Sequence, residues 1–324
     1  MSESILQKLS AGRVLRRGVA KPLLSVSEWL WRHLPDSARA LRPLVVYGSF
    51  LNVLVRLRSD RTQFHGTFFF RNRPELELMR RIATARAFGS RLKITVVACS
   101  NGAEVYSILW TIRSARPDLK LEVHAIDISS QIVEIAARGE YSLHTDQLIG
   151  SPIFERVTDE EMRNMFEPVD GQVRIRPWVK EGVEWEVGDA ADPKLAAALA
   201  GQDIVVANKF LCHMTPPDAE KCLRNVGQLV CPGGYLFVSG VDLDVRTKVA
   251  QELGWIPVPD LLEEIHDGDP SVRKDWPWRY WGLEPLDRKK SSWQLRYASV
   301  FQLSKRTPEA SNESESTKQV SCAL

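Results

Sequence analysis

The chain has 324 residues, of which 44% are hydrophobic and 26% charged, the composition of a globular protein with one large domain. Its 43 lysines and arginines nearly balance its 41 aspartates and glutamates, so the overall charge gives no reason to expect nucleic acid or an acidic membrane as a partner. The five cysteines include no CxxC pair, which argues against a disulfide scaffold or a cysteine zinc site and favours a reducing, cytoplasmic location.

Residues 1–61 are expected to form a helical N-terminal region. Apolar residues recur at helical spacing up to Leu34, Pro35 ends this pattern, and a second apolar helix follows. The longest apolar run, Leu44–Val55, is too short to span a membrane, and residues 1–30 lack the pattern of a signal peptide. Lysines and arginines outnumber acids in this region, which fits either a solvated helix face or a docking patch for an acidic partner.

Residues 62–303 alternate short β-branched runs with helical stretches, which predicts a Rossmann-like α/β domain with a doubly wound, mostly parallel sheet. A final run, Gln294–Gln302, is expected to be a late antiparallel strand. Residues 304–324 are rich in Ser, Glu, Thr and Lys and are expected to form a disordered tail, because they cannot bury enough apolar surface to fold. The predicted parallel strands are Lys93–Ala98, Leu121–Ile126, Val183–Val187, Ile204–Ala207 and Tyr235–Ser239.

The first strand leads into a turn with a single glycine, Gly102, in the sequence ACSNGAE of residues 98–104. In α/β sheets of this kind the ligand binds beyond the carboxyl ends of the strands, where glycine turns bring backbone N–H groups close to it. One glycine is too few for the GxGxxG cradle of a dinucleotide, so a nicotinamide-dependent oxidoreductase is a weakly supported alternative. Glu104 adds negative charge at this turn, which suits a ligand with a cationic amino group and a sulfonium.

Acidic residues also follow the second and third predicted strands. Asp127 stands where an acid commonly accepts hydrogen bonds from both hydroxyls of a ribose, although it is also a candidate N-cap for the helix that would begin at Ile128. Asp189, followed by Ala190, stands where adenosine-binding sheets often contact the base, and it is equally a candidate for turn chemistry with Asp192. The sequence leaves both alternatives open for each acid.

Two sequence motifs stand at Thr67–Arg71 (TFFFR) and at Ala98–Ser107 (ACSNGAEVYS). They resemble, in the same order, the TxFFR signature and the ACSTGEEPYS motif of the CheR family, the chemotaxis-receptor glutamate methyltransferases. The resemblance extends over residues 62–239. The remaining motifs are Ala125–Ile128, similar to the TDI ribose motif; Ala137–Tyr141, similar to sGxY; Asp203–Asn208, similar to the fDvIfCR strand; and Cys231–Leu236, similar to the LxPGGxL turn.

The resemblance implies a class I methyltransferase that uses S-adenosyl-L-methionine as its methyl donor. It implies that Arg71 holds the methionine carboxylate of this cofactor, Glu104 its amino group and Asp127 its ribose. Taken alone, an arginine such as Arg71 is more often part of a surface ion pair. The full set of residues expected to contact the cofactor is Arg71, Ala98, Ser100, Gly102, Glu104, Asp127, Ile128, Asp189, Ala190 and Asn208.

Three departures from the family pattern lie where the methyl acceptor should approach. Asn208-Lys209 replaces an Arg-Asn pair, His213-Met214 replaces a tyrosine-phenylalanine pair, and Ala103 replaces the first glutamate of GEE. These changes put a receptor glutamate in doubt as the acceptor, and they leave open a small molecule or a protein side chain that is methylated on an oxygen or a carboxylate. They also leave open a non-catalytic sensor or scaffold that binds the cofactor.

The sequence does not predict the β-subdomain that some members of the family insert for receptor docking. Between residues 141 and 185 it shows only a helical stretch, Thr158–Phe166, and one possible hairpin at Asp170-Gly171. This insert is therefore not evident from the sequence.

Methyl transfer is an in-line displacement that needs the acceptor about 3 Å from the methyl carbon, and it needs a base only when the acceptor is a hydroxyl or an ammonium group. His213 and His266 are the candidate bases, and a packed structural role is the alternative for His213. Asp267 and Asp269 flank His266 closely, but such a group seldom binds a metal without a fourth ligand, so no metal is expected.

An aromatic cluster stands in residues 276–281, WPWRYW, with four aromatic side chains in six residues. It fits a hydrophobic plug over the sheet or the lining of an acceptor pocket. We expect the acceptor to contact these aromatic residues and the basic N-terminal helices, and not to be a chemoreceptor glutamate.

Overall fold

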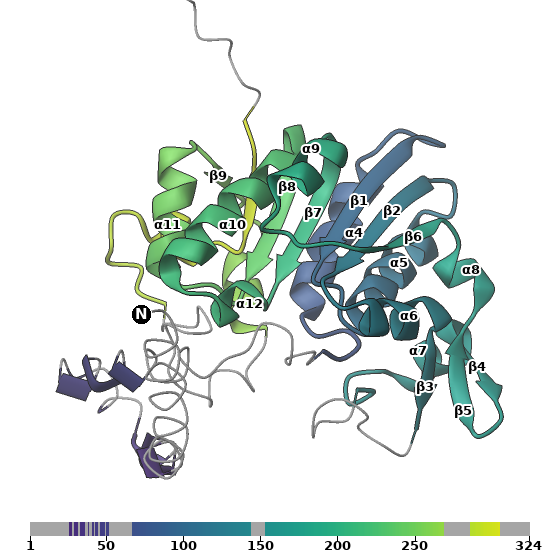
Figure 1. Ribbon diagram of the computed structural model, residues 1–324, viewed down its shortest axis with the longest axis horizontal. Helices are drawn as coiled ribbons and strands as arrows, with labels where there is room; N and C mark the ends of the chain where they lie inside the picture. Colours follow the sequence, from purple (N-terminus) through teal and green to yellow (C-terminus); the bar gives the residue numbers. More distant parts are fainter. Residues whose placement is uncertain are drawn as a thin grey trace, which may run out of the picture.

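The computed structural model describes residues 67–143, 153–268 and 286–304, together with scattered, mostly helical residues between 26 and 51. Its main feature is a seven-stranded sheet with the strand order β6-β2-β1-β7-β8-β10-β9 (Figure 1). No helix in these ranges is long and apolar enough to cross a membrane. The strands are β1 (Arg91–Val97), β2 (Lys120–Asp127), β6 (Val183–Val187), β7 (Gln202–Asn208), β8 (Val230–Ser239), β9 (Ile256–Pro257) and β10 (Val300–Gln302).

The five strands β6, β2, β1, β7 and β8 run parallel, as the sequence predicts. Within the sheet, β1 is the first strand in the chain. The chain then adds β2 and β6 on one side of β1, and it returns to place β7 on the other side. This reversal creates a topological switch point between β1 and β7, the place where open α/β sheets bind their ligands.

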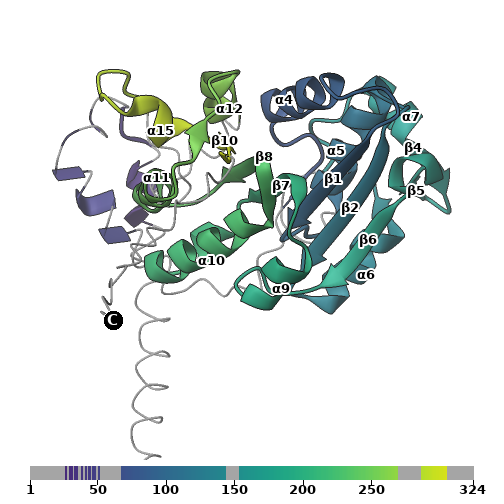
Figure 2. The same ribbon diagram turned by 90° about the horizontal axis from the view of Figure 1, so that it is seen from above.

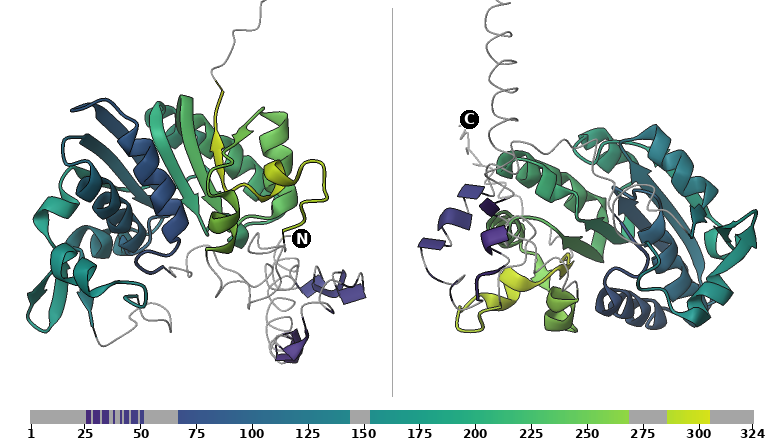
Figure 3. Two further views of the ribbon diagram at one scale, coloured as in Figure 1. Left: turned by 180° about the vertical axis from the view of Figure 1, so that it is seen from behind. Right: turned by 90° about the horizontal axis from the view of Figure 1, so that it is seen from below.

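Helices cover both faces of this sheet (Figure 2). On one face, α4 and α5 pack against the alternate residues Leu92, Ile94 and Val96 of β1; seen from behind, the blue helix α4 lies in front of the sheet (Figure 3). On the other face, α10 and α11 enclose a second apolar core that includes Val97 and Val205. The helices are α4 (Arg73–Thr84), α5 (Ala103–Ala115), α6 (Ser130–Arg138), α7 (Asp159–Met165), α8 (Pro177–Lys180), α9 (Pro193–Ala198), the 3-10 helix η1 (Leu211–His213), α10 (Pro216–Leu229), α11 (Leu243–Glu252), α12 (Leu262–Asp267) and α15 (Trp293–Tyr297).

The late antiparallel strand is present, but its predicted length is wrong. Only β10 is extended, pairing antiparallel with both β8 and β9, whereas Trp293–Tyr297 forms the short helix α15. Apolar residues at alternate positions, such as Leu295 and Tyr297, suggest a strand. A run this short does not distinguish the two-residue period of a strand from the 3.6-residue period of a helix. Tertiary packing decides the outcome, because Tyr297 is fully buried in the helical conformation.

The structure contains a small β-subdomain that is not evident from the sequence. Three short strands form a separate antiparallel sheet in the order β3-β5-β4, which lies beyond the β6 edge of the main sheet (Figure 1). The predicted helix and hairpin are both present, as α7 with its capping box at Thr158 and as the turn at Asp170-Gly171. Strand β3 is not predicted from the sequence, because it has only three residues and follows α6 directly after Gly139. The strands are β3 (Glu140–Ser142), β4 (Phe166–Val169) and β5 (Gln172–Ile175).

Candidate functional site

A cleft opens at the carboxyl ends of β1, β2, β6 and β7, at the switch point of the sheet. Nine of the ten residues that the sequence predicts to contact a cofactor line it; the tenth, Gly102, shapes the turn but does not face the cleft. Apart from His213, four further lining residues are not among those that the sequence predicts to contact a cofactor, although Thr67 lies in the TFFFR motif and Lys209 in a pair that departs from the family pattern. The cleft is lined by Thr67, Arg71, Ala98, Ser100, Glu104, Asp127, Ile128, Gly188, Asp189, Ala190, Asn208, Lys209, Phe210 and His213.

The turn after β1 takes an unusual backbone path. Ala98 (φ 55°) and Ser100 (φ 50°) are in the left-handed region, and Gly102 (φ 85°) precedes the first residue of α5 in the same region. Non-glycine residues rarely adopt this conformation, and it persists only where the surrounding structure imposes it. Two other non-glycine residues beside the cleft, Phe70 (φ 53°) and Lys209 (φ 60°), share it. The backbone around the site is thus held in a strained shape.

Asp127 fixes this turn from the neighbouring strand. One carboxylate oxygen accepts a hydrogen bond from the Ser100 backbone N–H at 2.9 Å, and the other accepts from the Ser129 N–H at 3.1 Å. Asp127 is not the N-cap of α6, the alternative that the sequence left open, because the Ser129 side chain caps that helix by accepting from Ile132. The Asp127 carboxylate lies at the wall of the cleft, and its proposed contact with a ribose remains a prediction.

The loop that carries Arg71 is pinned to the first turns of α5. The Ser107 hydroxyl accepts a hydrogen bond from the Phe70 N–H at 3.0 Å and donates one to the Ala103 carbonyl at 2.7 Å. Phe69 anchors the loop on the other side by packing against Phe154 of the segment before α7. The first and second sequence motifs therefore meet through Ser107, and together they place Arg71 at the cleft.

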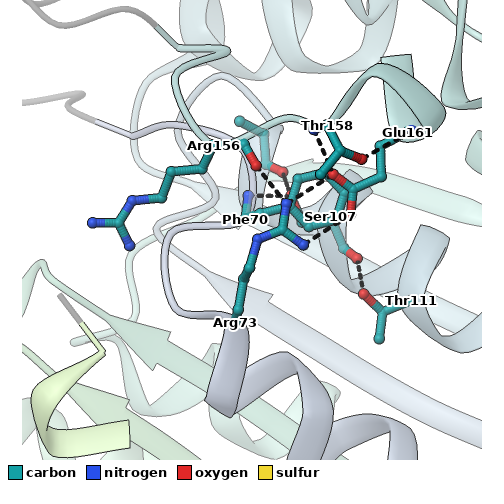
Figure 4. Close-up of polar contacts among 8 residues, drawn as sticks. Phe70, Arg73, Ser107, Thr111, Arg156, Thr158 and Glu161 are labelled. Atoms are coloured by element: carbon teal, nitrogen blue, oxygen red, sulfur yellow. Dashed lines mark hydrogen bonds and ion pairs between the residues drawn. The ribbon is translucent and has the colours of Figure 1, made fainter. Parts of the chain in front are cut away.

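Hydrogen bonds made by Arg73 and Arg156, together called the clasp, join this loop to the region around α7 (Figure 4). Arg73 donates to both carboxylate oxygens of Glu161, at 2.9 and 2.8 Å, and also to the carbonyl of Arg156. Arg156 in turn donates to the carbonyl of Arg71 and, at 3.1 Å, to that of Gly268. The backbone at Arg71 is therefore held by segments far apart in the sequence.

The side-chain amide of Asn208 donates hydrogen bonds to two carboxylates, those of Glu75 and Glu104. Asn208 Nδ2 donates to an oxygen of Glu75 at 2.7 Å and to an oxygen of Glu104 at 2.9 Å. The Ser239 hydroxyl donates to Asn208 Oδ1 at 2.7 Å, which fixes the orientation of the amide. Burial, followed by the nearby charge of Glu104, raises the pKa of Glu75 to about 8. No signal in the sequence points to Glu75.

The two candidate bases lie in different places. His213, in η1, lines the cleft, and burial lowers its pKa to about 4. His266, in α12, is buried and packs edge-to-face against Tyr297 at 5.2 Å, and the structure does not bring it to the lining of the cleft. The aromatic cluster of residues 276–281 and Asp269 lie outside the described residues.

His213 is expected to lower the free energy of unfolding of the protein in acid. The pKa of His213 is about 4 in the folded state and near 6.5 in the unfolded state. As the pH falls below 6.5, the unfolded chain therefore binds a proton that the folded protein does not bind, and this favours unfolding. Between pH 7 and pH 4.5 this difference costs about 2 kcal/mol of stability. Urea unfolding at both pH values should show a smaller loss for His213→Gln than for the wild type; an equal loss would contradict the prediction.

One group of potential metal ligands appears that the sequence did not suggest. His124 of β2 lies beside Glu184 and Glu186 of β6, with Nδ1 at 2.8 Å from Glu186, and their ligand atoms all lie within 4.8 Å of one another. The three residues come together only through the pairing of β2 with β6. Both glutamates are solvent-accessible, and surface ion pairs of this kind are common without a metal.

Comparisons with known proteins identify the family of this chain. The model of the family described as CheR methyltransferase, SAM binding domain, matches residues 65–249. The probable biofilm formation methyltransferase WspC of Pseudomonas aeruginosa is 25% identical over 64% of this chain and 48% of its own length. Chemotaxis protein methyltransferases of Pseudomonas putida (Cher2) and Vibrio parahaemolyticus are 29% and 30% identical, over 46% and 45% of this chain and 54% and 52% of theirs.

This chain spans about half the length of the curated relatives it matches. The family match itself covers more than half of this chain and includes both the TFFFR and the ACSNGAE motifs. The chain therefore belongs to the CheR family of S-adenosylmethionine-dependent methyltransferases.

Proposed function

We propose that this protein transfers the methyl group of S-adenosylmethionine to a carboxylate on a protein side chain. The observation that carries the proposal is the cleft at the switch point, where a guanidinium and several carboxylates converge from separate elements. Each charge matches one part of the cofactor: Arg71 its carboxylate, Glu104 its ammonium and Asp127 its ribose hydroxyls. Asp189 and Ala190 lie along the same cleft, where the adenine would bind.

The protein's contribution to the reaction is positioning. The bound cofactor supplies a methyl group on a positively charged sulfur, and displacement at that carbon requires the acceptor in line and close. The clasp at Arg71 and the hydrogen bonds of Asp127 hold the surrounding groups in fixed positions. A rigid cleft of this kind lowers the entropic part of the barrier without a covalent step by the protein.

The state of His213 favours a carboxylate acceptor. A carboxylate is already ionised and needs no base, whereas a hydroxyl or an ammonium group must lose a proton. Within the described residues His213 is the histidine that lines the cleft, and a pKa of about 4 makes it a weak base at neutral pH. The chemistry of the cleft therefore suits an acceptor that arrives deprotonated.

The small sheet β3-β5-β4 supports a protein acceptor, because the resemblance to the family associates such an insert with docking. Relatives of this chain are chemotaxis protein methyltransferases by name. Lys209 and His213, which depart from the family pattern, lie along the cleft, and for this reason we expect an acceptor other than the chemoreceptor glutamate.

The first test is cofactor binding. S-adenosylhomocysteine, which lacks the transferable methyl group, should bind with micromolar affinity and raise the melting temperature by mass action. At a ligand concentration about 100 times the Kd, the folded state gains about 2.7 kcal/mol. Absence of a thermal shift at millimolar ligand, with folded protein, would contradict the proposal.

The second test identifies the acceptor chemistry. When this protein is incubated with methyl-tritiated S-adenosylmethionine and a bacterial protein extract, proteins of the extract should become labelled. Mild base should release the label as volatile methanol, because carboxyl methyl esters hydrolyse in base. Label that resists base would indicate a different acceptor atom, and efficient labelling of a receptor-derived glutamate peptide would overturn the expectation of a new acceptor. Binding of S-adenosylhomocysteine without any transfer would favour a sensor or scaffold.

A further inference from the structure

Glu75 and Glu104 approach each other through one shared hydrogen-bond donor. Glu75 lies in the first turn of α4 and is only 4% exposed, while Glu104 lies in the first turn of α5. Their oxygens lie 2.7 and 2.9 Å from the same nitrogen of Asn208. A small pocket adjoins the cleft between these two helices and is bordered by both carboxyls.

Two anions so close together and shielded from water are not both stable, so one of them tends to hold a proton. The cationic groups that face the pair are Arg71, from the loop before α4, and Lys209, which follows β7; Asn208 and Ser239 are uncharged. Both cations lower the pKa of Glu75, but burial and the charge of Glu104 outweigh them. Burial raises the pKa of Glu104 as well.

Glu75 is the more enclosed member of the pair, whereas Glu104 lines the cleft that would receive the cofactor. We propose that Glu75 is a positioning residue that holds a proton while the cleft is empty and releases it to solvent when a cationic amino group binds Glu104. This inference rests on the proposed role of Glu104 at the methionine end of the cofactor. The Glu75 O–H bond breaks, the electron pair stays on the carboxylate, and the proton passes to the buffer.

The reason is electrostatic. An ammonium group beside Glu104 adds a positive charge to the pair, and a nearby opposite charge favours the ionised form of both carboxyls. With Glu75 ionised, Asn208 donates to two carboxylates, and such charge-assisted hydrogen bonds are stronger than those to a neutral acid. The methionine end of the cleft therefore tightens when the cofactor arrives.

A linked proton makes cofactor affinity depend on pH. Since the complex binds fewer protons than the empty protein, affinity rises with pH until the empty protein has also lost its proton, near pH 8. Between pH 6 and pH 8 the Kd of the wild type for S-adenosylhomocysteine should fall by about tenfold or more. In Glu75→Gln, which keeps the shape and a carbonyl oxygen for Asn208, it should change much less.

Isothermal titration calorimetry tests this directly. S-adenosylhomocysteine is titrated into the full chain at pH 7 in phosphate and in Tris, whose ionisation enthalpies differ, so that the difference in heat counts the protons released. The wild type should release most of one proton and Glu75→Gln much less. The matched control is Glu77→Gln on the same helix, because Arg80 and Arg81 lower the pKa of Glu77 to about 2 and it stays ionised throughout.

The outcomes separate the two proposals. Equal proton release by the wild type and Glu75→Gln, or binding by the wild type without release, overturns the role of Glu75 and leaves the proposed function intact. Absence of binding by folded wild type overturns the proposed function itself. If Glu75→Gln does not fold, the pH dependence of the wild-type Kd still decides, because a flat profile from pH 6 to pH 8 contradicts the inference.

Discussion

Replacing Asp127 by alanine is expected to weaken S-adenosylhomocysteine binding by about tenfold or more, because two charge-assisted hydrogen bonds to the ribose would be lost at ~1.5–3 kcal/mol each before relaxation. The same change leaves the backbone N–H groups of Ser100 and Ser129 without their acceptor. We therefore expect some loss of stability as well. Calorimetry on the folded fraction, with the unfolding free energy measured in parallel, separates the two effects.

Asp192 provides the control for this variant. It follows the neighbouring strand β6, caps α9 by accepting from the Lys194 N–H at 2.9 Å, and does not line the cleft. Asp192→Ala should cost about 1 kcal/mol of stability, as the loss of a helix cap does, and should leave the Kd unchanged. If Asp127→Ala behaves in the same way, the carboxylate serves the fold alone and the ribose assignment is wrong.

Replacing Gly102 by alanine is expected to lower the free energy of unfolding by about 2–5 kcal/mol. Part of this is backbone strain, since a left-handed conformation costs a non-glycine residue ~1–2 kcal/mol. The rest is crowding: an added Cβ would lie 3.1 Å from the side chains of both Trp185 and Tyr106 and 3.2 Å from that of Ala136. Overpacking of this kind costs about 1–3 kcal/mol. Urea unfolding measures the sum.

Gly233→Ala separates the two contributions to the Gly102 effect. Gly233 has nearly the same φ (86°), but among the described residues no atom beyond its chain neighbours lies within 4 Å of the position its Cβ would take. Its replacement should therefore cost only the strain, ~1–2 kcal/mol. An equal loss in both variants would show that crowding around Gly102 is negligible. The Gly102 variant should also bind S-adenosylhomocysteine more weakly, because the turn before α5 must shift.

Local signals in the sequence were sufficient for the parallel sheet and for most of the cleft. The β-branched runs are long enough to reveal their period, and the residues after β1, β2, β6 and β7 meet at one edge because parallel strands share their direction. Asp127 and Asp189 are therefore neighbours of the cleft for a reason visible in the chain order. Whether each contacts the cofactor remains a prediction.

Long-range packing limited what the sequence could predict. Glu75 and Asn208 are 133 positions apart, and nothing near Glu75 distinguishes it from Glu77, a surface residue of the same helix. His266 carries a plausible chemistry, but the helix that contains it buries its ring against Tyr297. The three-residue strand β3 acquires its conformation only from pairing with β5. In each case the decisive partner lies elsewhere in the chain.

The left-handed residues around the cleft have a consequence for how this protein can change. Phe70, Ala98, Ser100 and Lys209 each hold a conformation that costs a non-glycine residue ~1–2 kcal/mol, and together they offset a substantial part of the 5–15 kcal/mol by which a typical protein is stable. Glycine at such positions would relieve the strain but loosen the walls of the site. Selection for thermal stability alone would therefore tend to erode the cleft, so directed evolution of this scaffold should screen ligand binding alongside heat resistance.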